Sequence, residues 1–168
     1  KYIYVVSTDS IVILDAYPAE QSKILSKIEF NGTPQEIFIN KDKLVVFEQE
    51  SYYYATARAE IGIVAPRYST PKTFVKVYDI SDRTNPVLKR NVSIDGSYFD
   101  SRMIGDYVYT ITNQPVYGEP VPLPMIYSNN KAIEIPATDI YYFDIPDSSY
   151  NFANILAINT QNDGQELS

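Results

Sequence analysis

The chain has 168 residues, of which 45% are hydrophobic, and its formal net charge is −7. This length and composition indicate one folded domain with a substantial core and exclude wholesale disorder. Cysteine and histidine are both absent, which excludes a disulfide framework, a thiolate zinc site and a histidine-based catalytic triad in this segment. Lys1 already stands at the start of a strand-like run without a signal-peptide pattern, so we expect a piece of a longer protein.

The negative charge lies in the C-terminal part of the chain. Residues 1–102 contain thirteen basic and thirteen acidic residues, whereas 103–168 contain eight acidic residues and only Lys131 as a basic one. Because nucleic acid requires a basic stripe, the sequence predicts no nucleic-acid partner. An acidic surface that aids solubility is the simplest interpretation, although a cationic ligand or a hard metal ion is electrostatically permitted.

Two parts of the chain repeat at an offset of 64 residues, with Asp15–Phe47 matching Asp79–Ile111 without a gap. In each copy an apolar run ends on an aspartate, a proline-containing turn follows, and a second run leads to a glycine. Repeats of this size built from four short strands are typical of propellers, in which each unit buries its apolar face against its neighbours. The repeat therefore predicts an all-β fold, a fragment of a β-propeller built from four-stranded antiparallel blades.

Alternation and turn residues place the individual strands. The expected strands, in chain order, are 2–6, 11–15, 23–30, 35–40, 43–48, 73–80, 87–94, 98–104, 107–112 and 153–159. They divide the partial propeller domain 1–168 into a partial blade at 1–30, a complete blade at 35–94 and a partial blade at 98–159. A single helical turn is expected at Ala19–Ser22, after Pro18.

The connection between the second and third strand of a blade differs strongly between the units. It is the tight turn 7–10 in the first unit, but it grows to 49–72 in the second and to 113–152 in the third. The third connection holds six of the eleven prolines, and proline cannot donate to a strand ladder, so we expect loop there. Its many aromatic residues, among them Tyr141, Tyr142 and Phe143, predict that this loop packs down on the blades.

The middle of the chain carries a family resemblance in Lys72–Asp82, Asn85–Pro86, Asp95–Ile104 and Asn113–Tyr117. These residues resemble the prokaryotic, largely archaeal, secreted proteins that have a C-terminal β-propeller domain and are distantly similar to WD-repeat propellers. The resemblance implies a propeller fold and a location in a secreted or cell-surface protein. It implies no reaction and no catalytic residues.

The two insertions supply the candidate ligand surface, because loops on one face of a repeat protein commonly form its binding site. The candidate residues are aromatic or acidic: Tyr52, Tyr53, Tyr54, Tyr117, Tyr127, Asp139, Asp144 and Asp147. The aromatic rings suit stacking on a sugar or a peptide, or alternatively anchor the insertions on the blades. The three aspartates suit Ca²⁺ in residue type, but their spacing matches no calcium loop, so we expect no cofactor.

Aspartates and glycines at repeated positions have simpler interpretations. Asp15 and Asp79 end equivalent strands, where an aspartate accepts backbone N–H bonds in an Asx-turn, and Asp42 and Asp106 are expected to do the same in the following turns. The repeated glycines, at positions 32 and 96, are expected to supply permissive backbone between blades.

These observations favour a binding or scaffold module of a secreted or cell-surface protein, with an unknown protein or carbohydrate ligand. The alternative is a secreted hydrolase whose active site lies on the face with the insertions and is completed by blades outside this segment. A purely structural surface-layer component is a third interpretation. In each case the strand edges at the two ends of the fragment predict association with another copy of the chain.

Overall fold

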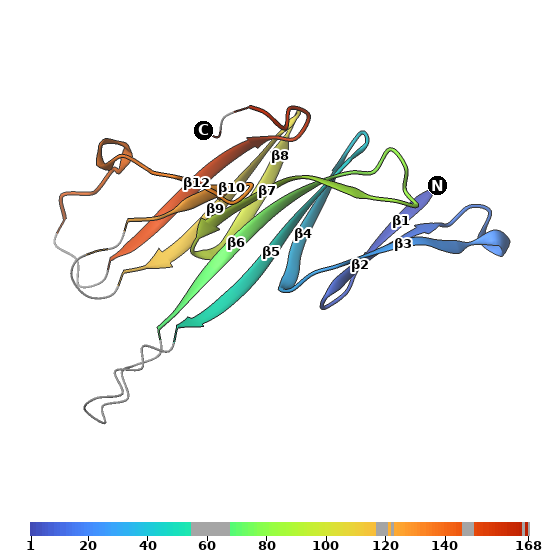
Figure 1. The fold of residues 1–168 in the computed structure, drawn as a ribbon, viewed down its shortest axis with the longest axis horizontal. Helices are drawn as coiled ribbons and strands as arrows, with labels where there is room; N and C mark the ends of the chain where they lie inside the picture. The colour runs from blue at the N-terminus through green and yellow to red at the C-terminus, as the bar shows by residue number, and fades with distance from the viewer. Residues whose placement is uncertain (55–67, 117–120, 122, 146–149, 166, 168) are drawn as a thin grey trace, which may run out of the picture.

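The computed structural model describes residues 1–54, 68–116, 121, 123–145, 150–165 and 167, and the side chains of 51–70 lie outside this description. Three antiparallel sheets follow one another along the long axis of the molecule (Figure 1). Two short 3-10 turns, η1 (Ala19–Gln21) and η2 (Ala137–Asp139), accompany them. In the described part of the chain no helix is both long and apolar enough to cross a membrane.

The strands follow the expected positions closely. The first sheet has the order β1 (Tyr2–Val6), β2 (Ser10–Asp15), β3 (Lys23–Glu29). The second has the order β11 (Lys131–Ile133), β10 (Ile126–Ser128), β7 (Val87–Asp95), β6 (Tyr68–Asp79), β5 (Lys43–Tyr54), β4 (Thr33–Asn40). The third has the order β12 (Asn151–Asn159), β9 (Tyr107–Pro115), β8 (Ser97–Ile104). All strand pairs are antiparallel, and the fold is all-β.

Two predicted loops are partly strand. In the stretch 49–72, β5 continues to Tyr54 and β6 begins at Tyr68, so only 55–67 connects them, and those residues lie outside the described part. In the stretch 113–152, β9 continues to Pro115 and a short hairpin forms from β10 and β11. The prediction of continuous loop was wrong at both places, because tyrosine and isoleucine favour strand and the ladders include Pro71 in β6 and Pro115 in β9.

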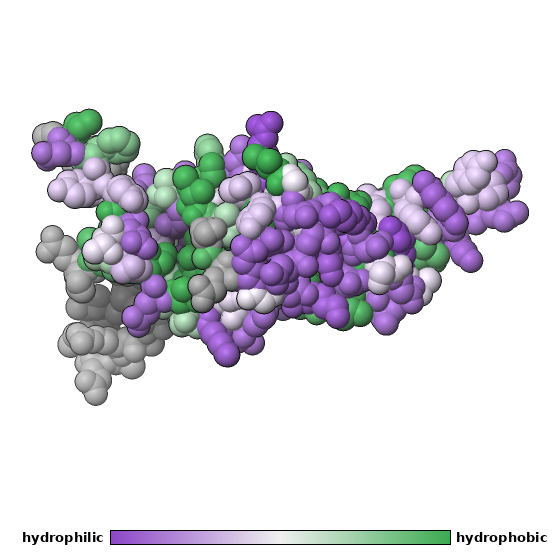
Figure 2. All heavy atoms as spheres, turned by 90° about the horizontal axis from the view of Figure 1, so that it is seen from above, coloured by the Kyte–Doolittle hydropathy of each residue, from purple (hydrophilic) through white to green (hydrophobic). Residues whose placement is uncertain are grey.

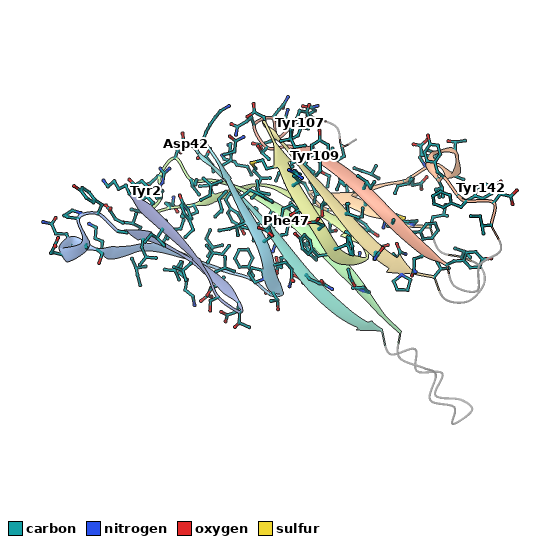
Figure 3. All side chains as sticks on the ribbon, turned by 180° about the vertical axis from the view of Figure 1, so that it is seen from behind. Tyr2, Asp42, Phe47, Tyr107, Tyr109 and Tyr142 are labelled. Atoms are coloured by element: carbon teal, nitrogen blue, oxygen red, sulfur yellow. The ribbon has the colours of Figure 1, made fainter. Side chains whose placement is uncertain are left out.

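The second sheet contributes to a hydrophobic core on each of its two faces. Leu44 and Val46 of β5 join a first core with Ile11 and Ile13 of the first sheet. Their neighbours on β5 point the opposite way, because successive side chains of a strand alternate between its faces. Phe47 belongs to this second set and lies at the centre of the molecule (Figure 3).

The second core forms between the second and third sheets. Val45 and Phe47 from β5 lie in one cluster with Leu156 and Ile158 from β12. The ring of Phe47 also packs against Tyr98 of β8, with ring centroids 5.5 Å apart. Because each core takes residues from two sheets, neither outer sheet buries its apolar face without the central one.

The sequence repeat appears again in the backbone hydrogen bonds. Ile80 N–H donates to the Asp42 carbonyl at 2.8 Å, and at the equivalent place Thr160 N–H donates to the Asp106 carbonyl at 2.8 Å. The Asx-turn expected at Asp79 is present, since its carboxylate accepts from the hydroxyl and N–H of Ser81 at 2.6 and 3.0 Å. These bonds, with that from Lys43, hold the pKa of Asp79 far below its ordinary value.

The carboxylates of Asp42 and Asp106 differ from the prediction. Instead of local turn bonds, Asp106 accepts from Asn40 Nδ2 at 2.9 Å and from Lys41 Nζ at 3.1 Å, both in the turn of the neighbouring sheet. Asp42 likewise reaches Arg83, 3.8 Å away. The contacts of Asp106 with Asn40 and Lys41 link successive sheets across the turns near the upper edge in Figure 3, where Asp42 is labelled.

Both repeated glycines lie close to the backbone of an equivalent residue, and a Cβ at Gly96 would come 2.9 Å from the Asn113 carbonyl oxygen. Gly96 has a φ of +109°, a conformation that side chains with a Cβ rarely adopt. Gly32 has no positive φ, but a Cβ there would lie 2.7 Å from Glu50 Cγ and 2.9 Å from the Gln49 backbone carbon. Close approach of two backbones, rather than conformational freedom, is therefore what requires glycine at position 32.

We expect Gly32→Ala to destabilise the fold because the added methyl group overlaps backbone that cannot move without opening the β4–β5 pairing. The matched control is Gly105→Ala, where a Cβ meets no atom within 4 Å but φ is +61°. The free energy of unfolding from urea titration should fall by at least about 1 kcal/mol more in Gly32→Ala than in the control. Equal losses in the two variants would contradict the close-approach explanation.

Candidate functional site

The insertion of the third unit folds back on the second sheet. Its β10 strand pairs antiparallel with β7, in the register Ile126 with Ile94 and Ser128 with Val92. The turn of the hairpin has Asn129 and Asn130 at φ of 48° and 67°, the left-handed pair that favours tight two-residue hairpins. The hairpin covers an edge of β7 that would otherwise expose its backbone groups.

Polar contacts hold the start of this hairpin. Met125 N–H donates to the Asp95 carboxylate at 3.1 Å, and Asp95 N–H donates to the Met125 carbonyl at the same distance. Lys72 lies 3.6 Å from the other carboxylate oxygen, and its ammonium stands 4.4 Å from the centre of the Tyr127 ring. Tyr127 is half-buried in this arrangement, where a cation–π contact anchors it. Its part in ligand binding remains a prediction.

The three consecutive tyrosines of the second unit lie on a two-stranded ribbon. Tyr52, Tyr53 and Tyr54 pair with residues 70, 69 and 68 of β6. The ribbon extends beyond the rest of the second sheet, and β5 and β9 point toward the same end of the molecule (Figure 1). The side chains of these tyrosines lie outside the described part, so their contribution to a ligand surface remains a prediction.

Among the side chains that the structure describes, the most exposed aromatic ones follow η2. Tyr141, Tyr142 and Phe143 are 93%, 85% and 89% exposed, and Ile145 is exposed beside them. Tyr142 lies at the end of the molecule opposite to the first sheet (Figure 3). The expectation that these rings pack down on the blades was wrong, although their aromatic character was the signal that drew attention to them. We call residues 140–145 the aromatic segment.

The acidic candidates are only partly brought together. Asp139 and Asp144 flank the aromatic rings and are exposed, and Asp139 accepts a hydrogen bond from the hydroxyl of Thr138 at 3.3 Å. Tyr117 and Asp147 lie outside the described residues. Within the described ranges no group of three acidic side chains is placed to hold a metal ion.

A buried ionic cluster lies between the first and second sheets, and its only signal in the sequence is a glutamate in an apolar run. Glu48 is fully buried, and one carboxylate oxygen accepts from Gly32 N–H at 2.6 Å. The other oxygen accepts from Lys76 Nζ. The Lys76 ammonium also stands 5.3 Å from the centre of the Phe30 ring. Because every charge in the cluster has a partner, it links the two sheets rather than offering a free catalytic group.

Tyr78 lies in the same core as this cluster. Burial, and secondarily the negative charge of Glu48, raises the pKa of Tyr78 to about 12 from the ordinary value of 10.0. Its phenol therefore keeps its proton in the folded state at a pH where the unfolded chain loses it.

This difference predicts a loss of stability at high pH. Between pH 10 and pH 12 the folded state binds more protons at Tyr78 than the unfolded state. The contribution of Tyr78 to the free energy of unfolding is therefore complete below pH 10 and falls as the pH rises. By pH 12 the loss should reach about 2 kcal/mol. The control is Tyr78→Phe, which keeps the ring and removes the ionising group. If urea titrations show the same alkaline loss in both proteins, Tyr78 is not its source.

Comparison with known proteins agrees with this architecture. The chain belongs to a family described as beta propeller domain, whose model matches residues 1–168. An uncharacterised protein of Archaeoglobus fulgidus is 24% identical over 153 residues, which cover 89% of this chain and 20% of that protein. The chain thus spans about a fifth of the length of this relative. No solved structure shows a significant match.

Proposed function

We propose that this part of the propeller is a binding module and that the aromatic segment is its recognition surface. The single observation that carries the proposal is the exposure of three consecutive rings, Tyr141, Tyr142 and Phe143. Scattered apolar residues on a surface are ordinary, but adjoining exposed aromatic side chains are typical of interaction sites. Tyrosine in particular supplies rigid contact area that combines apolar and polar character.

The charge around the segment favours a protein ligand with a basic surface. Glu134, Asp139 and Asp144 are the charged side chains nearest in sequence on the described part, and all three are exposed. Opposite charges around an aromatic centre increase the rate of association and select the partner. A carbohydrate ligand need not be positively charged, so the acidic side chains around the rings do not favour it.

The fold supports this segment without enclosing it. The β10–β11 hairpin is bound to β7, and β12 returns the chain to the third sheet, so both sides of the segment are attached to strands. Attachment at both ends limits the chain entropy that the segment can lose on binding. We further propose, from the resemblance to secreted propeller proteins, that the ligand is met outside the cytoplasm. In the described residues no observation favours the hydrolase alternative.

A phage-displayed random-peptide library tests the proposal. The wild-type chain should enrich peptides that combine Lys or Arg with apolar residues, because such peptides complement aromatic rings flanked by carboxylates. The triple variant Tyr141→Ala, Tyr142→Ala, Phe143→Ala should weaken binding of the enriched peptides by about tenfold or more.

Phe99→Ala is the matched control, since Phe99 is an exposed aromatic residue on β8, an edge strand of the third sheet. Unchanged binding by the triple variant would overturn the proposal. A glycan array in which the wild-type chain binds a saccharide, and the triple variant does not, would identify a carbohydrate ligand in place of a basic protein.

A further inference from the structure

Three dipeptides in the chain place glycine directly after an asparagine or an aspartate: Asn31–Gly32, Asp95–Gly96 and Asp163–Gly164. The backbone nitrogen of such a glycine can attack the side-chain carbonyl before it and close a succinimide ring, because no Cβ hinders the approach. An aspartate is ionised at neutral pH, and its carboxylate resists this attack. Asn31, whose side-chain amide is neutral, is therefore the most labile of the three in an unfolded chain.

The reaction at Asn31 needs nothing beyond the chain and water. Gly32 N gives up its proton and forms a bond to Asn31 Cγ, while the bond from Cγ to Nδ2 breaks and Nδ2 leaves as ammonia with that proton. Water then opens the succinimide and leaves aspartate or isoaspartate at position 31. Isoaspartate carries the backbone through the side-chain carbon, so it would displace the glycine that follows it.

Neither burial nor a change of residue protects this dipeptide. Asn31 is exposed in the connection between β3 and β4, so water reaches its side chain. Position 32 requires glycine, because a Cβ there would lie 2.9 Å from the backbone carbon of Gln49. Protection of Asn31 in the folded protein is therefore left to the attacking nitrogen.

That nitrogen is held by a buried carboxylate. Gly32 N–H donates to Glu48 Oε1 at 2.6 Å, and Glu48 is fully buried on β5 with its other oxygen bonded to Lys76. Attack on Asn31 requires Gly32 N to lose the proton that this hydrogen bond uses. The negative charge that develops on the nitrogen then lies beside the carboxylate, and like charges repel more strongly away from water.

The dipeptide of the next unit, 64 residues further on, is held in a similar way. Gly96 N–H donates to the Pro71 carbonyl at 2.9 Å, and the Asp95 carboxylate accepts from Met125 N–H at 3.1 Å. The third dipeptide lies instead in an exposed turn, where Gly164 N–H donates to the side chain of Asn162 at 3.2 Å. The two dipeptides at the repeated position are thus held by other strands.

We propose that Asn31–Gly32 is a latent deamidation site that the Glu48 carboxylate keeps closed in the folded protein. The hydrogen bond that closes the site also ties β5 to the connection between the first two sheets. Deamidation of Asn31 then requires this connection to open, and its rate follows the population of the open form.

The first test needs no variant. The folded chain and the guanidinium-unfolded chain are incubated at mildly alkaline pH, and peptide mapping by mass spectrometry follows deamidation of Asn31 and isoaspartate formation at Asp163. Folding should slow Asn31 by at least about tenfold, because the connection must open first, and should slow Asp163 less. Equal slowing at the two positions would assign the protection to folding in general and would overturn the proposal.

The second test removes the charge beside the attacking nitrogen. The double variant Glu48→Gln, Lys76→Met removes both partners of the buried ion pair together, so no charge is left unpaired there. Glutamine keeps an oxygen that can accept from Gly32 N–H, but this acceptor is neutral. Deamidation of Asn31 in the folded variant should be faster than in the wild-type chain by at least about fivefold, the difference between hydrogen bonds to charged and to neutral acceptors.

The matched control is the double variant Lys43→Met, Asp79→Asn. It also removes a lysine–carboxylate pair, and the Lys43 side chain is 14% exposed, as is that of Lys76. It leaves the Glu48 hydrogen bond intact, so Asn31 should react at the wild-type rate wherever urea titration shows all three proteins to be folded. Equal rates in the two double variants would overturn the proposal. Slower deamidation without Glu48 would do so as well, because the carboxylate would then act as a base for the attack.

Discussion

The structure depends on the burial of the second sheet on both faces. Along Leu44–Glu48 of β5 every side chain is buried, with alternate residues in the first and second cores. A strand covered on both faces has no solvent side, so a charge that falls there must find its partners inside the protein. That constraint explains why the Glu48 carboxylate accepts hydrogen bonds from the Gly32 N–H and the Lys76 ammonium. It also explains why the backbone of Gln49 lies so close to Gly32.

Packing of the sheet faces does not cover the backbone groups at the sheet edges, which need other partners. On β7 the chain uses its own insertion, since the β10–β11 hairpin pairs there and is anchored through Asp95. The remainder of the insertion is then free to present exposed rings at the end of the molecule. On the face seen in Figure 2, hydrophilic residues cover much of the body of the molecule, and a band of hydrophobic residues lies to their left. One insertion thus combines a structural hairpin with the proposed recognition surface.

The sequence predicted strands well wherever alternation and turn residues repeat, because both reflect backbone geometry directly. It failed where a residue type was taken to decide structure alone. Proline around 113–152 was taken to exclude strand, yet the proline-free stretch 126–133 forms a hairpin. Aromatic character at Tyr141 was taken to predict burial, yet burial depends on a facing surface that no local pattern reports. The hydrogen-bond partners of Glu48 could not be predicted for the same reason, since one of them comes from the connection between two sheets.

The most direct test of two-sided burial is native-state hydrogen exchange in increasing denaturant. If the central sheet couples its neighbours, amides of β2, β5 and β9 should converge on one free energy of opening, that of global unfolding. Convergence would show that neither outer sheet opens without the central sheet. Exchange of β2 at a distinctly lower free energy, with β5 and β9 still protected, would show that the first sheet opens independently and would contradict the account.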